Sequence, residues 1–255
     1  MKSRTRIIIF SVFAIILFAW ACVFFTLRTT SCMVFPDRTF GVYKLDDAAL
    51  GGTSTAEIDV GDSAIGISLN VRSGVAYPAV GVGFNLMSVE NRPAGVFNLS
   101  NYDSIEVVVS TGRMRSVSLR LLTDDPVYSK EGMRETLRPL VLNVPASRTP
   151  TSAKFSLADF RTAVWWLAAM GLEKDDGFMY LDRGAAIEIA NGDGIMRGIP
   201  DEIEVTSVRL WGINRDFERG MYAGLILVVV LLGLFGTNTF RIFSRKNIKT
   251  VGKHV

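Results

Sequence analysis

Two adjacent tryptophans, Trp165 and Trp166, have the side chains best suited to ligand chemistry in this sequence of 255 residues. Aromatic faces stack on sugar rings, so one tryptophan together with Tyr77 or Tyr102 could form a saccharide-binding platform. A structural role is the alternative, because neighbouring helical residues point about 100° apart and at least one ring would then pack against the domain. Trp165, Trp166, Tyr77 and Tyr102 are therefore our ligand-binding candidates.

Three acidic residues, Asp46, Asp47 and Glu204, are candidates for a metal site. They lie near opposite ends of the central part of the chain, and the first and last strands of a β-sandwich are often neighbours. Carboxylate oxygens are good ligands for calcium, so these acids could hold a structural Ca²⁺. We predict no cofactor apart from this candidate ion. The segment 191–194 (NGDG) also offers oxygen ligands, but it is shorter than an EF-hand loop and ordinary turn chemistry explains it better.

The central part of the chain has no recognisable catalytic group. The sole histidine is His254, near the C-terminus, which excludes a histidine-containing catalytic triad or a histidine-ligated zinc in residues 28–219. Acid pairs occur at 124–125 and 175–176, but glycoside hydrolysis needs two carboxylates at a defined separation and solvated loop acids are the simpler interpretation. No glycine-rich segment ends in the Gly-Lys-Ser/Thr of a phosphate loop. We predict that the protein is not an enzyme.

Short strands must position these residues, because apolar and polar residues alternate along most of residues 28–219. The predicted strands cover residues 64–71, 105–110, 116–122, 186–190 and 204–211. One helix is predicted over residues 156–170, capped by Ser156 or Asp159 and with Phe160, Val164, Leu167 and Ala168 on one face. Many short strands with one helical insert predict an all-β domain, a jelly-roll β-sandwich.

Four strings of residues, in order between about 40 and 217, support that fold by resemblance. They are 42–47 (VYKLDD), 76–84 (AYPAVGVGF), 97–105 (FNLSNYDSI) and 155–166 (FSLADFRTAVWW). Together they resemble the galactose-binding-like jelly-roll modules related to carbohydrate-binding modules, which occur as extracytoplasmic domains of some bacterial membrane regulators. Ala163 departs from the pattern, which carries proline there. The resemblance implies a jelly roll and glycan sensing, but no output domain.

Two uncharged segments, residues 7–27 and 220–240, flank the central domain. A helix of 21 residues at 1.5 Å per residue is about 31 Å long, which matches the hydrocarbon core of a bilayer. A cleaved signal peptide is the alternative for the first segment. That segment is longer than the usual apolar region of roughly 7–15 residues, and no clear small-x-small cleavage site follows it. We predict that both segments are transmembrane helices.

The distribution of charge predicts the orientation of the chain. All 25 acidic residues and 20 of the 28 basic residues lie in 28–219, which gives this region a net charge of −5. The tails 1–6 and 241–255 hold the other basic residues and no acid. The positive-inside rule therefore places both tails in the cytoplasm and residues 28–219 in the periplasm of a bacterium. The overall charge of +3 is accordingly no sign of nucleic-acid binding.

Together these observations predict an inner-membrane protein that presents a carbohydrate-binding-like sensory domain to the periplasm. In this hypothesis the domain binds a glycan and the two helices couple it to a separate membrane or cytoplasmic protein partner. The alternative is a structural subunit of a cell-envelope complex, in which the sandwich is a platform for other proteins. Neither hypothesis involves nucleic acid.

Overall fold

The fold is taken from a computed structural model, which describes residues 2–87 and 96–230. The chain divides into two compact units, one formed by Thr30–Gly212 and the other by residues 1–29 with 213–255. The predicted second membrane span lies outside the described residues from position 231 onward, as does the whole predicted tail 241–255.

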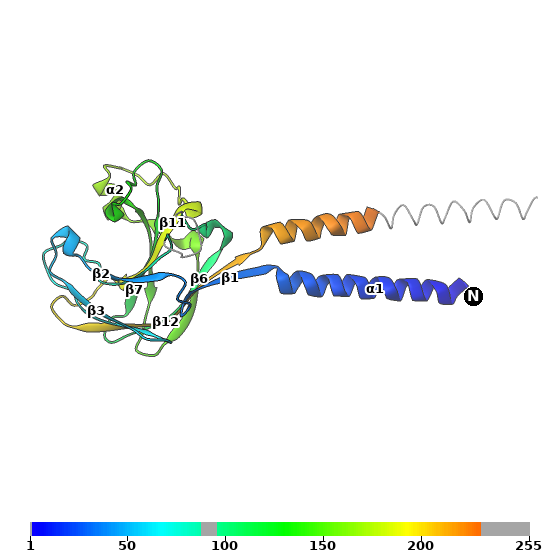
Figure 1. The fold of residues 1–255 in the computed structure, drawn as a ribbon, viewed down its shortest axis with the longest axis horizontal. Helices are drawn as coiled ribbons and strands as arrows, with labels where there is room; N and C mark the ends of the chain where they lie inside the picture. The colour runs from blue at the N-terminus through cyan, green and yellow to red at the C-terminus, as the bar shows by residue number, and fades with distance from the viewer. Residues whose placement is uncertain (1, 88–95, 231–255) are drawn as a thin grey trace, which may run out of the picture. The chain divides into compact units, whose positions relative to one another are not determined.

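The unit Thr30–Gly212 is a sandwich of two six-stranded β-sheets (Figure 1). Sheet A has the order β3-β4-β12-β6-β9, and β1 also pairs with β12. Its strands are β1 (Thr29–Phe35), β3 (Thr55–Val60), β4 (Ile65–Asn70), β6 (Ser104–Thr111), β9 (Thr151–Ser156) and β12 (Asp201–Ile213). Sheet B has the order β10-β8-β7-β11-β5-β2. Its strands are β2 (Gly41–Leu45), β5 (Gly81–Asn85), β7 (Ser116–Thr123), β8 (Arg138–Pro145), β10 (Arg161–Thr162) and β11 (Gly184–Asn191).

Neighbouring strands along both of these orders run antiparallel, and the chain crosses repeatedly from one sheet to the other. The predicted jelly-roll-like, all-β sandwich is thus confirmed. The five predicted strands are present as β4, β6, β7, β11 and β12. In β4 the reason is plain, since Ile65, Ile67 and Leu69 are buried while Gly66 and Ser68 are exposed.

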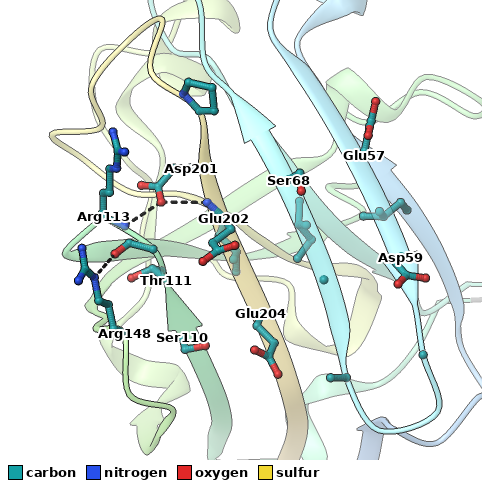
Figure 2. A pocket seen from close by; sticks show the side chains of 18 residues that line it. Glu57, Asp59, Ser68, Ser110, Thr111, Arg113, Arg148, Asp201, Glu202 and Glu204 are labelled. Atoms are coloured by element: carbon teal, nitrogen blue, oxygen red, sulfur yellow. Dashed lines mark hydrogen bonds between the residues drawn. The ribbon is translucent and has the colours of Figure 1, made fainter.

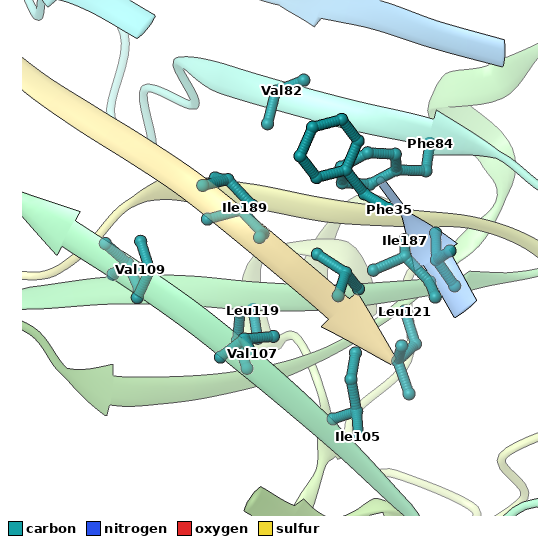
Figure 3. Close-up of a cluster of buried hydrophobic side chains, with 14 of the residues drawn as sticks. Phe35, Val82, Phe84, Ile105, Val107, Val109, Leu119, Leu121, Ile187 and Ile189 are labelled. Atoms are coloured by element: carbon teal, nitrogen blue, oxygen red, sulfur yellow. The ribbon is translucent and has the colours of Figure 1, made fainter. Parts of the chain in front are cut away.

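The core lies between the two sheets (Figure 3). Sheet A contributes Ile105, Val107 and Val109 from one face of β6. Sheet B faces them with alternate residues of three strands, which are Val82 and Phe84 of β5, Leu119 and Leu121 of β7, and Ile187 and Ile189 of β11. Because these side chains take every second position, the intervening residues of sheet B point away from the core and form its outer face.

The predicted helix over 156–170 is shorter in the structure. Ser156 ends β9, and its hydroxyl accepts a hydrogen bond from the Ala158 amide at 3.2 Å, which caps a single 3-10 turn. The α-helix α2 covers only Val164–Ala169. The predicted apolar face was wrong at Val164, which is 76% exposed, and at Ala168, which is also exposed. The 3-10 helices are η1 (Ala48–Leu50), η2 (Leu99–Asn101), η3 (Arg134–Thr136), η4 (Leu157–Asp159) and η5 (Leu181–Arg183).

The other unit consists of helix α1 (Lys2–Leu27) and a helical segment, 215–230. The two pack against each other, with the rings of Phe24 and Tyr222 5.7 Å apart. Arg28 Nε forms an ion pair with Glu218 at 3.2 Å. Over the part of the chain that the structure describes, no helix is both long enough and apolar enough to cross a membrane.

Candidate functional site

The outer face of sheet B supplies the floor of the candidate site. In β7, Val117 and Leu119 point into the core, so Ser118 and Arg120 point outward. Arg120 pairs in register with Val141 of β8, which in turn pairs with Arg161 of β10. The antiparallel register therefore brings Arg120 and Arg161 into one row across three strands.

A cavity of about 480 Å³ opens over this row. This volume is within the range of small-molecule sites. Trp165 of α2 and Tyr77 of the segment between β4 and β5 both line it, so the structure brings together two of the four predicted aromatic residues. Trp165 is half-buried against a small apolar cluster, whereas the side chain of Tyr77 is 59% exposed. The cavity thus has one anchored aromatic ring and one ring largely open to solvent.

Trp166 was predicted wrongly as a ligand-binding residue. Its side chain is fully buried, and its indole N–H donates a hydrogen bond to the Thr136 carbonyl at 3.3 Å. The ring of Tyr128 meets it edge-on at 5.7 Å, and the Arg138 guanidinium lies 5.0 Å from its centre. With its faces covered in this way, the ring cannot stack on a sugar.

Tyr102 is also absent from the residues that line the cavity. It follows η2, packs against the main core and stacks on Phe97 with ring centres 5.9 Å apart. The prediction that it contributes to the same platform was therefore wrong, because the strand order places it away from α2.

Two loops at the edge of the cavity are tied to each other by Asn191. Its side-chain oxygen accepts a hydrogen bond from the Val80 amide at 2.8 Å, and its side-chain nitrogen donates to the Pro78 carbonyl at 3.3 Å. Gly194 of the same NGDG segment has a φ of +80°, a left-handed backbone conformation that favours glycine and is typical of a turn. The turn interpretation of 191–194 is therefore confirmed, and the loop that carries Tyr77 is held in place before any ligand binds.

The cavity is rich in positive charge. Arg120, Arg161 and Arg197 line it, against a single carboxylate from Asp193. The Asp193 carboxylate already accepts a hydrogen bond from the Asn143 side chain. Burial lowers the pKa of the Arg120 guanidinium, while the charges of Glu188, its cross-strand neighbour in β11, and of Asp193 oppose that shift.

Sequence reasoning missed these arginines and Asn191. The one available signal for Arg120 was its position in the alternating string 116–122, where a charged residue stands among outward-facing positions. Nothing local could show that Arg161 and Arg197 would reach the same cavity, since they come from separate segments of the chain.

The three predicted calcium ligands do not form one group. Asp47 is buried and accepts hydrogen bonds from the Ser54 amide at 3.0 Å and the Ser54 hydroxyl at 2.6 Å. Asp46 pairs with Lys44 at 2.8 Å, a contact that together with the Ala48 amide lowers its pKa. Both follow β2 of sheet B, whereas Glu204 lies in β12 of sheet A. Among the described residues no cluster of three or more potential ligands could hold a metal ion, so this predicted ligand set was wrong.

A second and larger hollow lies on the outer face of sheet A (Figure 2). Its volume is about 1150 Å³, and its lining includes Glu57 and Asp59 of β3 and Glu202 and Glu204 of β12. No aromatic side chain is present among the residues that line it. This acidic groove offers carboxylates but no surface on which a sugar could stack, so it fits a saccharide less well than the cavity on sheet B.

Another aromatic residue of sheet B, Tyr43, is covered by its neighbours. The Arg134 guanidinium lies 3.8 Å from the centre of the Tyr43 ring, and the phenol donates to Glu188 Oε1 at 3.1 Å. Burial and the Glu188 charge raise the pKa of Tyr43 well above its usual value. Tyr43 lines a different hollow, of about 650 Å³, where Arg134 covers its ring. Trp165 and Tyr77 remain the aromatic residues that line the cavity over Arg120.

No protein-family model matches the sequence, and no curated protein matches it significantly. Several solved structures similar to this chain are carbohydrate-binding modules. One is the family 11 module from Clostridium thermocellum in complex with a β-1,3-1,4-mixed-linked tetrasaccharide, with 12% identity over 73% of this chain and 96% of that chain and a TM-score of 0.47. Another is the family 11 module of a cellulosomal cellulase of Clostridium thermocellum, with 12% identity, 72% and 94% coverage and a TM-score of 0.48.

A third similar structure is the low-affinity xylan-binding module of family 86 from Roseburia intestinalis, with 9% identity, 74% and 97% coverage and a TM-score of 0.37. These proteins belong to the class that the four sequence strings resemble. The assignment of the β-sandwich itself rests on the two sheets described above.

Proposed function

We propose that this protein is a non-enzymatic saccharide-binding protein whose binding site is the cavity on the outer face of sheet B. The observation that carries the proposal is that Trp165 and Tyr77, from separate segments, line one cavity together with polar side chains. Aromatic faces provide stacking surfaces for sugar rings, and the guanidinium and amide groups provide hydrogen bonds to hydroxyl groups. A cavity that is largely formed in advance reduces the entropy lost on binding.

A glycan array followed by calorimetric titration of the full chain in detergent tests this proposal. We expect at least one envelope or plant polysaccharide to bind, and Trp165→Ala to weaken that binding by about tenfold or more, the equivalent of roughly 1.4 kcal/mol. Trp211→Ala is the matched control, because Trp211 is half-buried in β12 of sheet A, outside the cavity. Binding that persists unchanged in Trp165→Ala would refute the assignment of the site, and no binding to any saccharide would refute the function.

We propose further that residues 7–27 and 220–240 anchor the chain in the inner membrane of a bacterium, with the sandwich in the periplasm. The support is the uncharged length of both segments and the basic residues beyond them. The protein should then remain in the membrane pellet after carbonate extraction. Protease added to spheroplasts should digest the sandwich and spare a tag fused to Val255. Release by carbonate, or loss of the tag, would contradict this topology.

Coupling to a protein partner is the last part of the proposal. In the leading version, glycan binding in the sheet B cavity is passed to a separate membrane or cytoplasmic protein. The alternative is a scaffold, which the open acidic groove on sheet A favours as a contact surface. Cross-linking in cells followed by pull-down separates the two, because a scaffold retains its partners in the Trp165→Ala variant and without added sugar.

A further inference from the structure

The arginines of the sheet B cavity are short of counter-ions. Arg120 has one described hydrogen bond, from Nε to the Ser118 hydroxyl at 3.5 Å. Arg161 donates only to main-chain carbonyls, those of Ala158 at 2.6 Å and Phe160 at 2.7 Å. Arg197 donates to the Ala76 carbonyl at 3.5 Å. In the described part of the chain, none of the three arginines has a carboxylate at ion-pair distance.

Other arginines of sheet B and its loops are neutralised. Arg138, at the start of β8, is buried with Asp125 at 2.8 Å and Asp176 at 2.6 Å. Arg134 pairs with the buried carboxylate of Glu188. Arg120 feels the charges of Glu188 and Asp193 but forms no described ion pair with either, whereas Arg138 does with Asp125 and Asp176. A half-buried guanidinium without a direct ion pair costs free energy, so this contrast requires an explanation.

The geometry points to an acidic saccharide as the ligand of this cavity, with its carboxylate held by Arg120 and its ring against Trp165; this inference rests on the proposed saccharide-binding function. The planar guanidinium donates two parallel hydrogen bonds to a carboxylate, and such charge-assisted bonds are roughly twice as strong as neutral ones. Arg161 and Arg197 would receive the charges of neighbouring residues in the polymer. The aromatic lining requires that the anion also has an apolar ring face, which a sugar acid provides.

The domain as a whole is negatively charged, so binding of an acidic ligand would depend on contacts in this cavity and not on a general attraction of polyanions. Residues 28–219 have a net charge of −5, so long-range electrostatics do not draw a polyanion such as nucleic acid to this surface. Selectivity for an acidic ligand must then come from short-range contacts inside the cavity. Burial also lowers the pKa of Arg120, which is consistent with a cation that gains from a nearby anion.

Calorimetric titration of the full chain with a panel of oligosaccharides tests the inference. The panel contains oligomers of galacturonate, glucuronate and mannuronate, their neutral methyl esters, and cello-oligosaccharides. We expect at least one acid to bind about 10- to 100-fold more tightly than its methyl ester, and this difference to shrink as salt is added. The comparison uses the unmodified protein, so it does not depend on whether a variant folds.

Two variants test whether the preference for the acid over its ester arises in the sheet B cavity. Arg120→Gln should weaken binding of the acid by about 10- to 100-fold and binding of the ester by much less, so that the preference for the acid is lost. Arg113→Gln, an exposed arginine of the sheet A groove, should change neither. Equal affinity for acid and ester, or binding of neutral sugars alone, would overturn the acidic ligand while leaving the saccharide-binding function in place. Failure of every saccharide to bind would overturn both.

Discussion

Trp165 and Trp166 are adjacent in α2, yet Trp165 lines the sheet B cavity while Trp166 is fully buried among other residues. The Trp166 amide donates to the Ala163 carbonyl at 3.0 Å, which starts the helix and turns the second indole inward. Consecutive helical side chains point about 100° apart, so one helical step separates a ligand-facing ring from a core ring. The two residues therefore make separable contributions to binding and stability.

Replacement of Trp166 should reduce stability far more than replacement of Trp165. We expect Trp166→Ala to lower the free energy of unfolding by about 3–5 kcal/mol, because removal of a large buried ring leaves a cavity and the Thr136 carbonyl loses one of its two donors. Trp165→Ala, at a half-buried position, should cost less than about 2 kcal/mol. Chemical denaturation followed by circular dichroism measures both. Equal losses in the two variants would contradict the burial difference.

Arg138 should be one of the most sensitive charged positions in the domain. Its removal leaves the buried carboxylate of Asp125 without its cation, so Arg138→Met should cost about 3–5 kcal/mol in denaturant titration. Arg183→Met is the control, because its ion pair with Asp124 is partly exposed and should contribute about 1 kcal/mol or less. The double variant Arg138→Met with Asp125→Leu should recover part of the loss. A minor effect of Arg138→Met alone would show that the network is dispensable.

Stability should fall in acid through Asp176. Hydrogen bonds from Arg138 hold the pKa of this carboxyl below its usual range, whereas in the unfolded chain it is about 3.9. The lowered folded-state pKa means that the stabilisation is present above about pH 4 and disappears as the pH falls through the folded-state pKa. We expect Asp176→Asn to be less stable than wild type near neutral pH and to approach wild type near pH 2.

Urea titrations between about pH 2 and 7 measure this convergence. Asp59→Asn serves as the control, since Asp59 is exposed on β3 and has no described ion pair. If Asp176→Asn and wild type differ by the same amount at every pH, the contact with Arg138 does not produce the lowered pKa.

Gly83 of β5 should tolerate no side chain, because a Cβ atom there would overlap the ring of Tyr43. We expect Gly83→Ala to displace Tyr43 from Arg134 and Glu188 and to lower the free energy of unfolding by about 1–3 kcal/mol. Gly66→Ala is the matched strand control, because no atom lies within 4 Å of the Cβ position at Gly66. Thermal melts of both variants measure the difference in stability. An unchanged melting temperature for Gly83→Ala would show that the Tyr43 ring moves at no cost.

Much of the fold was predictable because the alternation of apolar and polar residues along each strand is visible in the local sequence. The alternation of Ile65, Ile67 and Leu69 with small or polar residues reflects the two faces of β4, and β6, β7, β11 and β12 show similar patterns. The predicted helix was too long because residues 156–170 contain no strong helix breaker. In the structure, the first part of this segment is taken up by the ends of strands, since β9 pairs with β6 and β10 pairs with β8. Tertiary pairing overrode local propensity there.

The site was predictable only in part. The residue types of Trp165 and Tyr77 suggested stacking, and the structure places both in one cavity. Trp166 and Tyr102 have the same chemistry, but their rings are occupied by neighbours. The acids Asp46 and Asp47 were grouped with Glu204 on the assumption that the first and last strands meet. The first strand, β1, does pair with the last strand, β12, but Asp46 and Asp47 follow β2, which belongs to the other sheet.

The sequence by itself determined the strand-rich character of the central domain, its negative charge and the two uncharged segments that flank it. These are properties of local composition and period, and they need no knowledge of distant contacts. Only the tertiary structure decided which aromatic ring is free, which arginines lack a counter-ion and which acids are already engaged. Burial and ion pairing depend on residues that strand pairing brings together from distant parts of the chain, so the row from Arg120 to Arg161 exists only once β7, β8 and β10 are paired.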